Sequence, residues 1–475
     1  MNVFARPVQD MPEPLTRRLR WGFVALFLIG GALRCYASFT TLAIMHPDEH
    51  QQFLEQAQRY VYGYGHLFWE QTDGLRHPLY PRLLAVPLAG MESVGIRDSL
   101  IQGCLMRWIV SLIALFAWSL FAWELHRRGD TMASLLMMCT IAFAPDIIYI
   151  HIHPLSETGA TITFLIALVL LGRHPFWAGA LLAISFGIRF QMGFIVGATV
   201  IFVWVMNRCR FDRPFLRLSL GFALAMFGLC LADKIVHGGW LHSPVAYYDA
   251  TVVRDLASMW GVEPWYAYIL WMGNGGLALV VPLGLLVLVG VRREWPLMLL
   301  VVAFVVPHSI VPHKEGRFML PVAPLMLALV SVGYSELARM CDVRFRRRLY
   351  GLALIGLIVV VVVRLPQILW NISPYGPTAN LLHDAGKRED LTGIIICGAD
   401  RSECGNYFYL RRNVPLVVVW EHPVEDLPKI NAAHGGKINY LMCWKKYADQ
   451  FEAYGPVKIA ESGYYVLYQL KAPPR

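Results

Sequence analysis

The residues best suited to chemistry in this sequence lie between His46 and Gln52, which read HPDEHQQ. Asp48 and Glu49 are adjacent carboxylates between two histidines, directly after the long apolar run of residues 21–44. Desolvating a carboxylate at the edge of a membrane-length segment costs free energy, so such a group is retained where it has a function. The pair therefore indicates a catalytic or substrate-binding role.

A second interpretation of Asp48 is structural, because aspartate commonly caps the first turn of a helix. The residues that follow place Phe53, Leu54 and Ala57 at helical spacing, and such a helix would bury them. Capping accounts for Asp48 but not for the glutamate and histidine beside it. Capping and catalysis are compatible, and the sequence leaves both open.

The composition is that of a membrane protein with many spans. Hydrophobic residues make up 56% of the chain and charged residues 16%, with a mean hydropathy of +0.47, whereas soluble domains carry about 25% charged residues. The net charge of +9 lies largely in short loops between apolar runs, where it orients the chain in the membrane. We therefore expect membrane lipids, and no nucleic acid, as partners.

Apolar runs and basic loops together predict about eleven transmembrane helices, with the N-terminus inside and the C-terminus outside. Residues 1–20 form the cytoplasmic N-terminus, and residues 21–366 form the transmembrane domain. Within that domain, residues 46–99 make a large first external loop with a short interfacial or re-entrant helix at Leu79–Gly95. The predicted spans are 21–44, 100–125, 131–150, 158–172, a hairpin over 175–205 that turns at Arg189, 215–236, 267–291, 295–310, 318–338 and 349–366.

Hydropathy falls sharply after residue 367. Four strand-like runs, GIIICG, VPLVVVW, INYLMCW and YYVLYQL, alternate there with turns and helical material. Residues 380–475 therefore predict a small α/β domain outside the membrane. The expected fold class is an all-α polytopic membrane protein with a small C-terminal α/β extramembrane domain.

The ionisable residues near the external ends of the predicted spans gather on one face. They are Asp48, Glu49, His153, Glu157, Arg189, Asp233 and the segments Tyr247–Glu263 and His313–Arg317. Each alone has a structural explanation: Asp233 could pair with Lys234, and Arg189 could extend its charge to the membrane surface. Ionisable groups that converge on one face indicate a functional site.

The segment His313–Arg317, HKEGR, places cations beside a helix N-terminus on the side where the orientation rule expects few. Such a segment suits a phosphate or pyrophosphate. Asp48 or Glu49 could then take a proton from an acceptor hydroxyl as a general base. Since a phosphate leaves without a general acid, an inverting transfer needs one carboxylate rather than the pair of a glycosidase.

Three common phosphate- or nucleotide-binding patterns are missing from the sequence: DxD, GxGxxG and the P-loop. The DxD pair holds the metal of many soluble nucleotide-sugar transferases. Its absence and an external site, away from cytosolic nucleotides, favour a lipid-linked sugar donor. We expect no cofactor, and no metal is required by the sequence.

Six blocks of the sequence resemble glycosyltransferase family 22, which contains the GPI-anchor and N-glycan mannosyltransferases of the GT-C fold. In order between residues 30 and 330, the blocks are HPDEHQQFLEQA, GYGHLFWEQTDGLRHPLYP, PLSET, DKIVHGGWLHSPVAYY, GVEPWYAYIL and PHKEGRFMLPVAPL. The blocks with HPDE and HKEGRF are together the most specific.

The resemblance implies transfer of mannose, or a related hexose, from a polyprenyl- or dolichyl-phosphate sugar to a hydroxyl of a lipid-linked or glycan acceptor. The transfer would invert the sugar carbon and occur on the external face. The resemblance implies that Asp48 is the base, with Glu49 as the second catalytic candidate. The expected substrate-binding set, with the last three residues on the donor phosphate, is His46, His50, Glu157, Arg189, Asp233, His313, Lys314 and Arg317.

A transporter or flippase of a lipid-linked saccharide is the alternative function, because a polytopic bundle with buried charges also fits that class. The sequence shows no internal repeat, and the one-sided polar site favours an enzyme. A structural scaffold would leave the external carboxylates and cations unexplained. The Pro-Pro-Arg C-terminus carries no retrieval signal for the endoplasmic reticulum, which favours the bacterial inner membrane over the endoplasmic reticulum membrane of a eukaryote.

Overall fold

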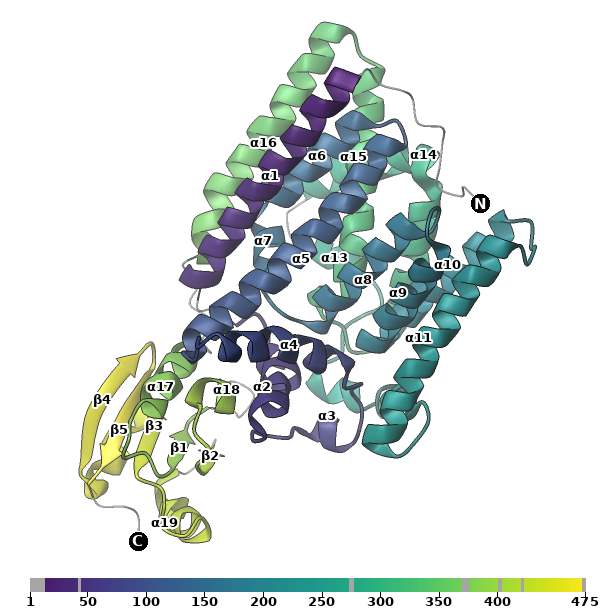
Figure 1. Cartoon of the computed structure of the whole chain (residues 1–475). Helices are drawn as coiled ribbons and strands as arrows, with labels where there is room; N and C mark the ends of the chain where they lie inside the picture. Colours follow the sequence, from purple (N-terminus) through teal and green to yellow (C-terminus); the bar gives the residue numbers. More distant parts are fainter. Residues whose placement is uncertain are drawn as a thin grey trace.

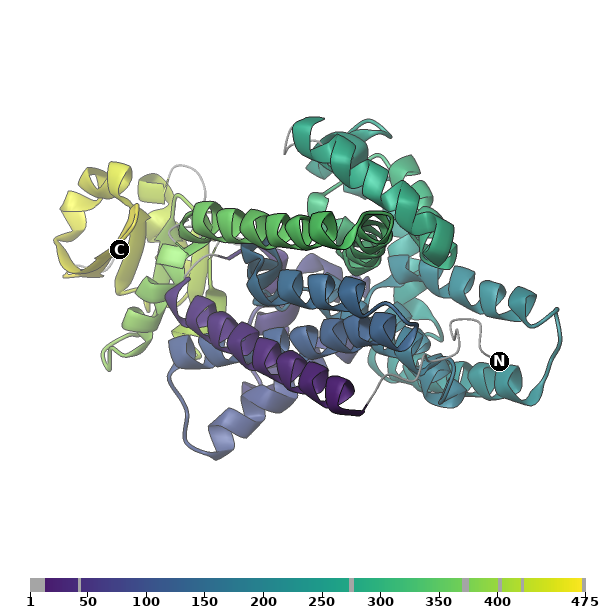
Figure 2. The same ribbon diagram turned by 90° about the horizontal axis from the view of Figure 1, so that it is seen from above.

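The computed structural model of the chain describes residues 13–41, 44–272, 277–369, 376–399, 404–419 and 423–471. They form a helical bundle with a smaller, sheet-containing unit at one end (Figure 1). Viewed from above, the sheet lies at the edge of the bundle (Figure 2). The predicted fold class is therefore confirmed.

Within the described residues, five helical segments are long and apolar enough to cross a membrane. They lie in α1 (Glu13–Thr40), α5 (Ser99–Arg127), α11 (Arg213–His237), η6 with α15 (Gly316–Val322 and Ala323–Arg339) and α16 (Val343–Leu369). A sixth is present if α6 (Thr131–Phe143) and α7 (Pro145–His151), bent by 66°, form one span. Shorter apolar helices are α8 (Ser156–Leu170), α9 (Pro175–Ile188) and η2 with α10 (Phe190–Met192 and Gly193–Met206).

Several predicted spans are broken helices. The bend between α6 and α7 falls at Pro145, whose missing N–H cannot continue a helix. The predicted turn at Arg189 is confirmed, since that residue is extended (φ −146°, ψ 112°) between α9 and η2. Predicted spans 267–291 and 295–310 correspond to α13 (Ala267–Met272) and α14 (Leu277–Ile310), and the α14 backbone leaves helical geometry at Glu294.

The bundle core forms around α5. Leu115, Trp118 and Phe121 of α5 are almost completely buried and belong to one cluster with Phe164 and Leu165 of α8. The middle of the bundle is therefore apolar.

One glycine on each helix allows the backbones of α9 and α11 to pack closely. A Cβ atom at Gly179 of α9 would lie 2.0 Å from the carbonyl oxygen of Leu218, and one at Gly221 of α11 would lie 1.9 Å from that of Phe176. In a membrane, such close backbone packing replaces the hydrophobic effect between helices. The two helices are therefore fixed to each other as one unit.

Short helices cover the end of the bundle where the C-terminal unit lies. After α1 come η1 (Glu49–Leu54), α2 (Glu55–Tyr62), α3 (Trp69–Thr72) and α4 (Leu79–Ser93), and after α11 come α12 (His242–Tyr248), η3 (Asp249–Val253) and η4 (Leu256–Trp260). The predicted helix at Leu79–Gly95 is confirmed as α4. Phe53, Leu54 and Ala57 are buried, as the helical spacing requires.

The C-terminal unit contains a mixed five-stranded sheet in the order β2-β1-β3-β5-β4. Its elements are α17 (Gly376–Gly386), β1 (Ile394–Cys397), α18 (Asn406–Leu410), β2 (Leu416–Val419), α19 (Pro423–Ala433), β3 (Tyr440–Trp444), η8 (Lys445–Tyr454), β4 (Pro456–Ser462) and β5 (Tyr465–Leu470). Strands β1, β2, β3 and β5 match the predicted runs. The sequence does not predict β4, because this edge strand reads PVKIAES and lacks a continuous apolar face.

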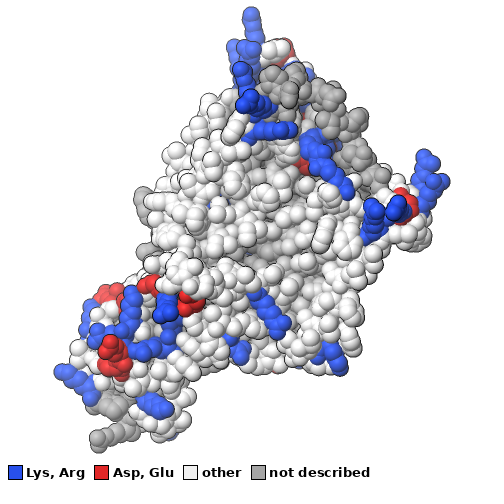
Figure 3. All heavy atoms as spheres, in the orientation of Figure 1, with Lys and Arg blue, Asp and Glu red and all other residues white. Residues whose placement is uncertain are grey.

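Surface charge separates the two ends of the molecule. Lys and Arg lie at the end opposite the C-terminal unit, where α16 begins with Arg344 and Arg346–Arg348, and Lys, Arg, Asp and Glu are mixed on the C-terminal unit (Figure 3). A broad band with few charges lies between the two ends. A bilayer requires such a band, and the apolar helices cross it. The molecule is a multi-pass membrane protein.

Two exposed positions test which end is inside. Val94, 72% exposed just after α4, and Met340, 71% exposed just before α16, lie at opposite ends. Because the basic end is expected in the cytoplasm, Val94→Cys should react with a membrane-impermeant thiol reagent on intact cells. Met340→Cys should react only after permeabilisation, like the native exposed Cys209 in the basic segment after α10. Labelling of Met340→Cys in intact cells would show that the predicted orientation is wrong.

Candidate active site

The two carboxylates of the HPDE segment face different surroundings. They stand at the start of η1, a π-helical segment, so their side chains leave the backbone in different directions. Asp48 meets Arg317 of the HKEGR segment, whereas Glu49 meets Arg107 of α5. The two neighbouring carboxylates therefore have different partners.

Asp48 is an accessible carboxylate held by cations. Its side chain is 17% exposed, and its Oδ2 accepts a hydrogen bond from Arg317 Nη2 at 2.7 Å and lies 3.5 Å from His46 Nδ1. Burial by itself raises the pKa of Asp48, but Arg317 and His46 more than offset burial and hold the pKa well below its usual range. The side chain makes no capping hydrogen bond to η1. The capping interpretation is therefore wrong.

Arg317 joins the carboxylates of the site. Besides Asp48, its guanidinium contacts Glu315 Oε2 from Nε at 2.7 Å and Glu157 Oε1 from Nη1 at 3.5 Å. Its side chain is only 8% exposed, and charges at such burial are retained when they are paired. Three carboxylates around one cation leave an excess of negative charge, which further cations must balance.

Glu315 connects Arg317 to two histidines. Its Oε2 lies 3.3 Å from His46 Nε2, and its Oε1 lies 3.1 Å from His313 Nε2. Burial raises the pKa of Glu315, but the hydrogen bond and charge of Arg317 outweigh burial and bring the pKa to about 2. The HKEGR segment therefore reaches Asp48 through its glutamate and its arginine.

Arg189 is the second cation of the site. From the turn between α9 and η2, its Nη1 lies 3.1 Å from Glu157 Oε1 and 3.2 Å from Ser156 Oγ, and its guanidinium lies 4.8 Å from the ring centre of Phe318. The residue is 4% exposed, yet Nε and Nη2 have no hydrogen-bond partner among the described residues. Buried donors left unbonded cost free energy, so these two nitrogens are available to an anion.

Glu49 belongs to a separate, buried cluster. Its Oε2 lies 2.6 Å from His153 Nδ1, and its Oε1 accepts from Arg107 Nε at 3.2 Å. Burial raises the pKa of Glu49, but His153 and Arg107 outweigh burial and lower the pKa to about 2. With no exposed surface, Glu49 anchors η1 between α5 and the segment after α7.

Glu70 and Arg76, which were not predicted as site residues, border Asp48 on another side. Arg76 Nη2 donates to Glu70 Oε1 at 2.8 Å, and its guanidinium lies 5.6 Å from the ring centre of Tyr247, whose hydroxyl bonds Gln191. Burial, and to a lesser extent Asp48, raise the pKa of Glu70 despite the opposing charge of Arg76. Glu70 and Arg76 belong to the block GYGHLFWEQTDGLRHPLYP, so the resemblance carried a signal for them.

Asp48, Glu157, Arg189, Glu315 and Arg317 form one charged network. Two of the expected substrate-binding residues lie outside this network. His50 is 1% exposed, its ring centre is 5.3 Å from that of Tyr409 in α18, and burial lowers its pKa to about 4. Asp233 accepts hydrogen bonds from the backbone N–H and the hydroxyl of Ser243, at 3.0 and 2.7 Å, and lies 3.7 Å from His77. Asp233 thus fixes the start of α12 rather than pairing with Lys234.

The other two cation candidates are engaged with the backbone. Lys314 is 5% exposed, and its Nζ donates to the carbonyl oxygens of Glu263 (3.0 Å), Val311 and Pro312 (3.4 Å). His313 Nδ1 lies 3.0 Å from the carbonyl oxygen of Gly261. Both residues join the HKEGR segment to the loop after η4.

The model of the Alg9-like mannosyltransferase family matches residues 25–392, which include every member of the charged network. The chain belongs to this family. The resemblance found in the sequence is therefore confirmed.

Curated relatives of this family member are moderately similar to it. Mannosyltransferase APTG1 of Arabidopsis thaliana is 24% identical over 335 aligned residues, which cover 65% of this chain and 58% of that protein. GPI alpha-1,2-mannosyltransferase 3 of Xenopus laevis is 24% identical over 438, which cover 84% of this chain and 70% of that protein. The chain thus spans less than two thirds of the length of the Arabidopsis protein.

Among solved structures, the crystal structure of ArnT from Cupriavidus metallidurans bound to undecaprenyl phosphate is similar, with a TM-score of 0.62. The alignment covers 94% of this chain and 98% of ArnT at 12% sequence identity. At that identity the similarity establishes the fold, which is the GT-C fold expected from the sequence.

Within the described ranges, no three or more His, Cys, Asp or Glu side chains are grouped so that they could hold a metal ion. The carboxylates around Asp48 pair with guanidinium groups instead. The expectation that no metal is required stays a prediction.

Glu49 gives a stability prediction for this family member. Glu49→Gln leaves Arg107 buried without its counter-charge, and breaking a buried ion pair costs about 3–5 kcal/mol. We expect a large loss of thermal stability in detergent, measured by size-exclusion chromatography after heating. Since the folded-state pKa of Glu49 lies below its usual 4.5, its contribution should be lost as pH falls from 4.5 towards about 2.

The matched control is Asp146→Asn, which breaks an exposed ion pair with Arg364. Exposed pairs contribute about 0–1 kcal/mol, so this variant should melt almost like the unaltered protein. Equal melting of the two variants would contradict the anchoring role of Glu49.

Proposed function

We propose that this chain is an inverting glycosyltransferase that moves mannose from a polyprenyl- or dolichyl-phosphate mannose to a hydroxyl of a lipid-linked or glycan acceptor. The observation that carries the proposal is the chain of contacts Asp48–Arg317–Glu157–Arg189. It joins an accessible carboxylate to a buried guanidinium with two unbonded nitrogens. The names of the mannosyltransferase relatives support mannose, and the undecaprenyl phosphate bound to ArnT supports a polyprenyl-phosphate donor.

In the proposed step, the acceptor hydroxyl oxygen forms a bond to the sugar C1 while the bond from C1 to the donor phosphate oxygen breaks. Asp48 takes the hydroxyl proton, and the lipid phosphate leaves as an anion. A strongly depressed pKa makes Asp48 a weak base but keeps it ionised at neutral pH. A weak base suffices because glycosyl transfer passes through an oxocarbenium-like transition state, in which C1 carries most of the positive charge before the proton leaves.

Arg189 is the proposed first contact of the leaving phosphate. A guanidinium binds phosphate oxygens with two parallel hydrogen bonds, and the two unbonded nitrogens of Arg189 supply such a pair. Arg317 already pairs with three carboxylates, and Lys314 with three carbonyl groups, so each would have to exchange a partner to bind the donor. The charge that these cations provide makes a metal unnecessary in this proposal.

The same proposal places the site on the external face of the membrane, with the C-terminal unit outside and the N-terminus inside. The external face is periplasmic in a bacterial inner membrane and luminal in the endoplasmic reticulum. The Lys and Arg residues of the short loops at the end opposite the C-terminal unit support this orientation (Figure 3). The family match and the relatives give no support to the transporter alternative.

Asp48→Asn tests the reaction directly. The purified protein is supplied with radiolabelled polyprenyl-phosphate mannose and a crude lipid acceptor extract, and the labelled product is quantified. A general base contributes about 10² to 10⁴ in rate, so Asn should reduce turnover by that factor and leave donor binding unchanged. Because Asn cannot neutralise Arg317, the melting temperature should also fall, so turnover is compared at a temperature at which both proteins stay folded. Full activity of the Asn variant would refute the role of Asp48.

Arg189→Gln tests donor binding. Loss of one charge-assisted contact costs about 1.5–3 kcal/mol, or roughly ten- to a hundredfold in kcat/KM for the donor. We expect the acceptor KM to stay unchanged, because the guanidinium faces Glu157 and the proposed phosphate. Lys314→Gln is the matched control, since its ammonium is already bonded to three carbonyl oxygens. A larger donor effect in Lys314→Gln than in Arg189→Gln would assign the phosphate to the HKEGR segment.

A further inference from the structure

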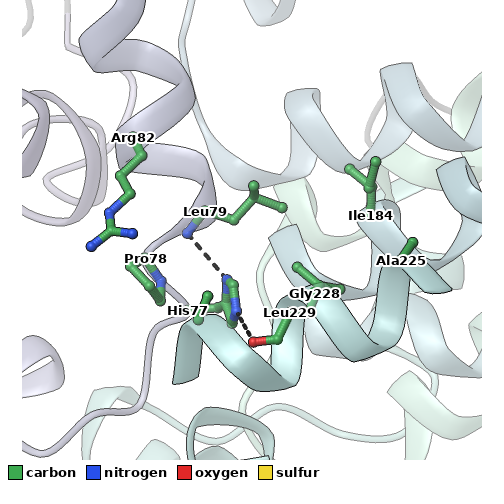
Figure 4. Close-up of a pocket in the computed structure, with 9 residues that line it drawn as sticks. His77, Pro78, Leu79, Arg82, Ile184, Ala225, Gly228 and Leu229 are labelled. Carbon is green, nitrogen blue, oxygen red and sulfur yellow. Dashed lines mark hydrogen bonds between the residues drawn. The ribbon is translucent and has the colours of Figure 1, made fainter. Parts of the chain in front are cut away.

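A cavity of about 240 Å³ lies between the start of α4 and the paired helices α9 and α11. Figure 4 shows Pro78 and Leu79 on one side and Ile184, Ala225 and Gly228 on the other. Apart from His77 and Arg82, the lining is apolar. The charged network uses neither the cavity nor Arg82.

The cavity exists because α11 presents small side chains here. A Cβ atom at Gly228 would meet no atom within 4 Å, whereas one at Gly221, two turns earlier, would strike the α9 backbone. The close packing at Gly221 prevents α9 and α11 from moving to fill the space near Gly228. The cavity is therefore a fixed feature of the helix pair.

The surroundings of the cavity face lipid. Val86 of α4 is 69% exposed, and Leu224 and Phe227 of α11 are 55% and 58% exposed. Both helices belong to the membrane part or its edge, where the solvent for such side chains is hydrocarbon. The natural occupant of an apolar cavity in this position is a lipid hydrocarbon chain.

The two polar residues of the lining, His77 and Arg82, have different surroundings. His77 is bonded to α11, with Nε2 3.1 Å from the carbonyl oxygen of Leu229 and 3.7 Å from Asp233. Arg82 is exposed, lies 5.1 Å from the ring centre of Tyr60, and has no ion-pair partner among the described residues. One uncompensated cation thus borders the cavity.

We propose that this cavity binds one acyl chain of an anionic glycerophospholipid, whose phosphate pairs with Arg82. The side chain of Arg76 turns to Glu70 and Tyr247, while Arg82 lies on α4 beside Pro78, so the two arginines serve different sites (Figure 4). His77, between them in the chain, is fixed to α11. The headgroup therefore lies at Arg82, outside the network of Asp48, and the bound lipid is a resident membrane lipid rather than a substrate. It would join α4 to the α9–α11 unit.

The test uses the full-length protein in nanodiscs with a phosphatidylglycerol that carries a diazirine in one acyl chain. After irradiation, mass spectrometry should map adducts to residues 225–232 of α11, and the corresponding phosphatidylcholine probe should give fewer. Arg82→Gln should reduce the preference for phosphatidylglycerol about tenfold or more, the effect of losing one charge-assisted contact. Arg97→Gln, an exposed arginine after α4, is the control.

A second variant fills the cavity. Gly228→Leu places a side chain in open space and should abolish the α11 adducts, whereas Gly284→Leu, where an added Cβ also meets nothing, should leave them unchanged. If Gly228→Leu does not fold, the Arg82 comparison decides. Equal labelling by both lipids, unchanged adducts in Gly228→Leu, or displacement of the probe by unlabelled polyprenyl phosphate would each overturn the proposal. Because labelling needs no turnover, the result is independent of the proposed glycosyl transfer.

Discussion

The structure depends on one electrostatic constraint: charges that enter the end of an apolar bundle must be paired. Arg317 meets this constraint with three carboxylates, Asp48, Glu157 and Glu315, taken from three distant parts of the chain. Removing one partner of such a cluster exposes the rest to the cost of an unpaired buried charge. The cluster therefore fixes how η1, α8 and η6 meet, and it does so at the place where the proposed chemistry occurs.

The two adjacent carboxylates also differ in their partners and in their exposure to solvent. Glu49 is completely buried and is paired with Arg107 and His153. Asp48 keeps 17% of its side chain accessible while its charge is stabilised. Because Glu49 holds η1 in place, the position of Asp48 next to Arg317 does not depend on a flexible loop. A reactive group supported by a rigid neighbour is what precise positioning requires.

The C-terminal unit takes part in the same arrangement from outside the bundle. Glu55 of α2, in direct continuation of η1, accepts hydrogen bonds from the backbone N–H groups of His66 (2.7 Å) and Phe408 (2.9 Å). Ser99 at the start of α5 donates to the carbonyl oxygen of Tyr409. Burial raises the pKa of Glu55 to about 7 despite these hydrogen bonds. The C-terminal unit is thus joined to the segment that follows Asp48 by contacts that include the titratable side chain of Glu55.

Much of this protein followed from the sequence because its signals are local. Apolar runs, basic loops and strand-like segments predict the long apolar helices, α4 and four of the five strands, since hydrophobic periodicity and loop charge act over short stretches of chain. The same signals missed β4, a polar edge strand, and could not show that Pro145 bends a span by 66°. The family resemblance identified the blocks that meet at the site, including the one that contains Glu70 and Arg76.

The tertiary structure decided the roles within those blocks. Only the folded chain shows that Asp48 and Glu49, neighbours in sequence, face different clusters, that Lys314 is bonded to backbone carbonyls, and that Arg189 keeps two buried nitrogens unbonded. Such facts depend on side-chain direction and on partners more than a hundred residues away. A sequence fixes which charges are present at the membrane edge, but only packing decides which of them are paired and which remain for a substrate.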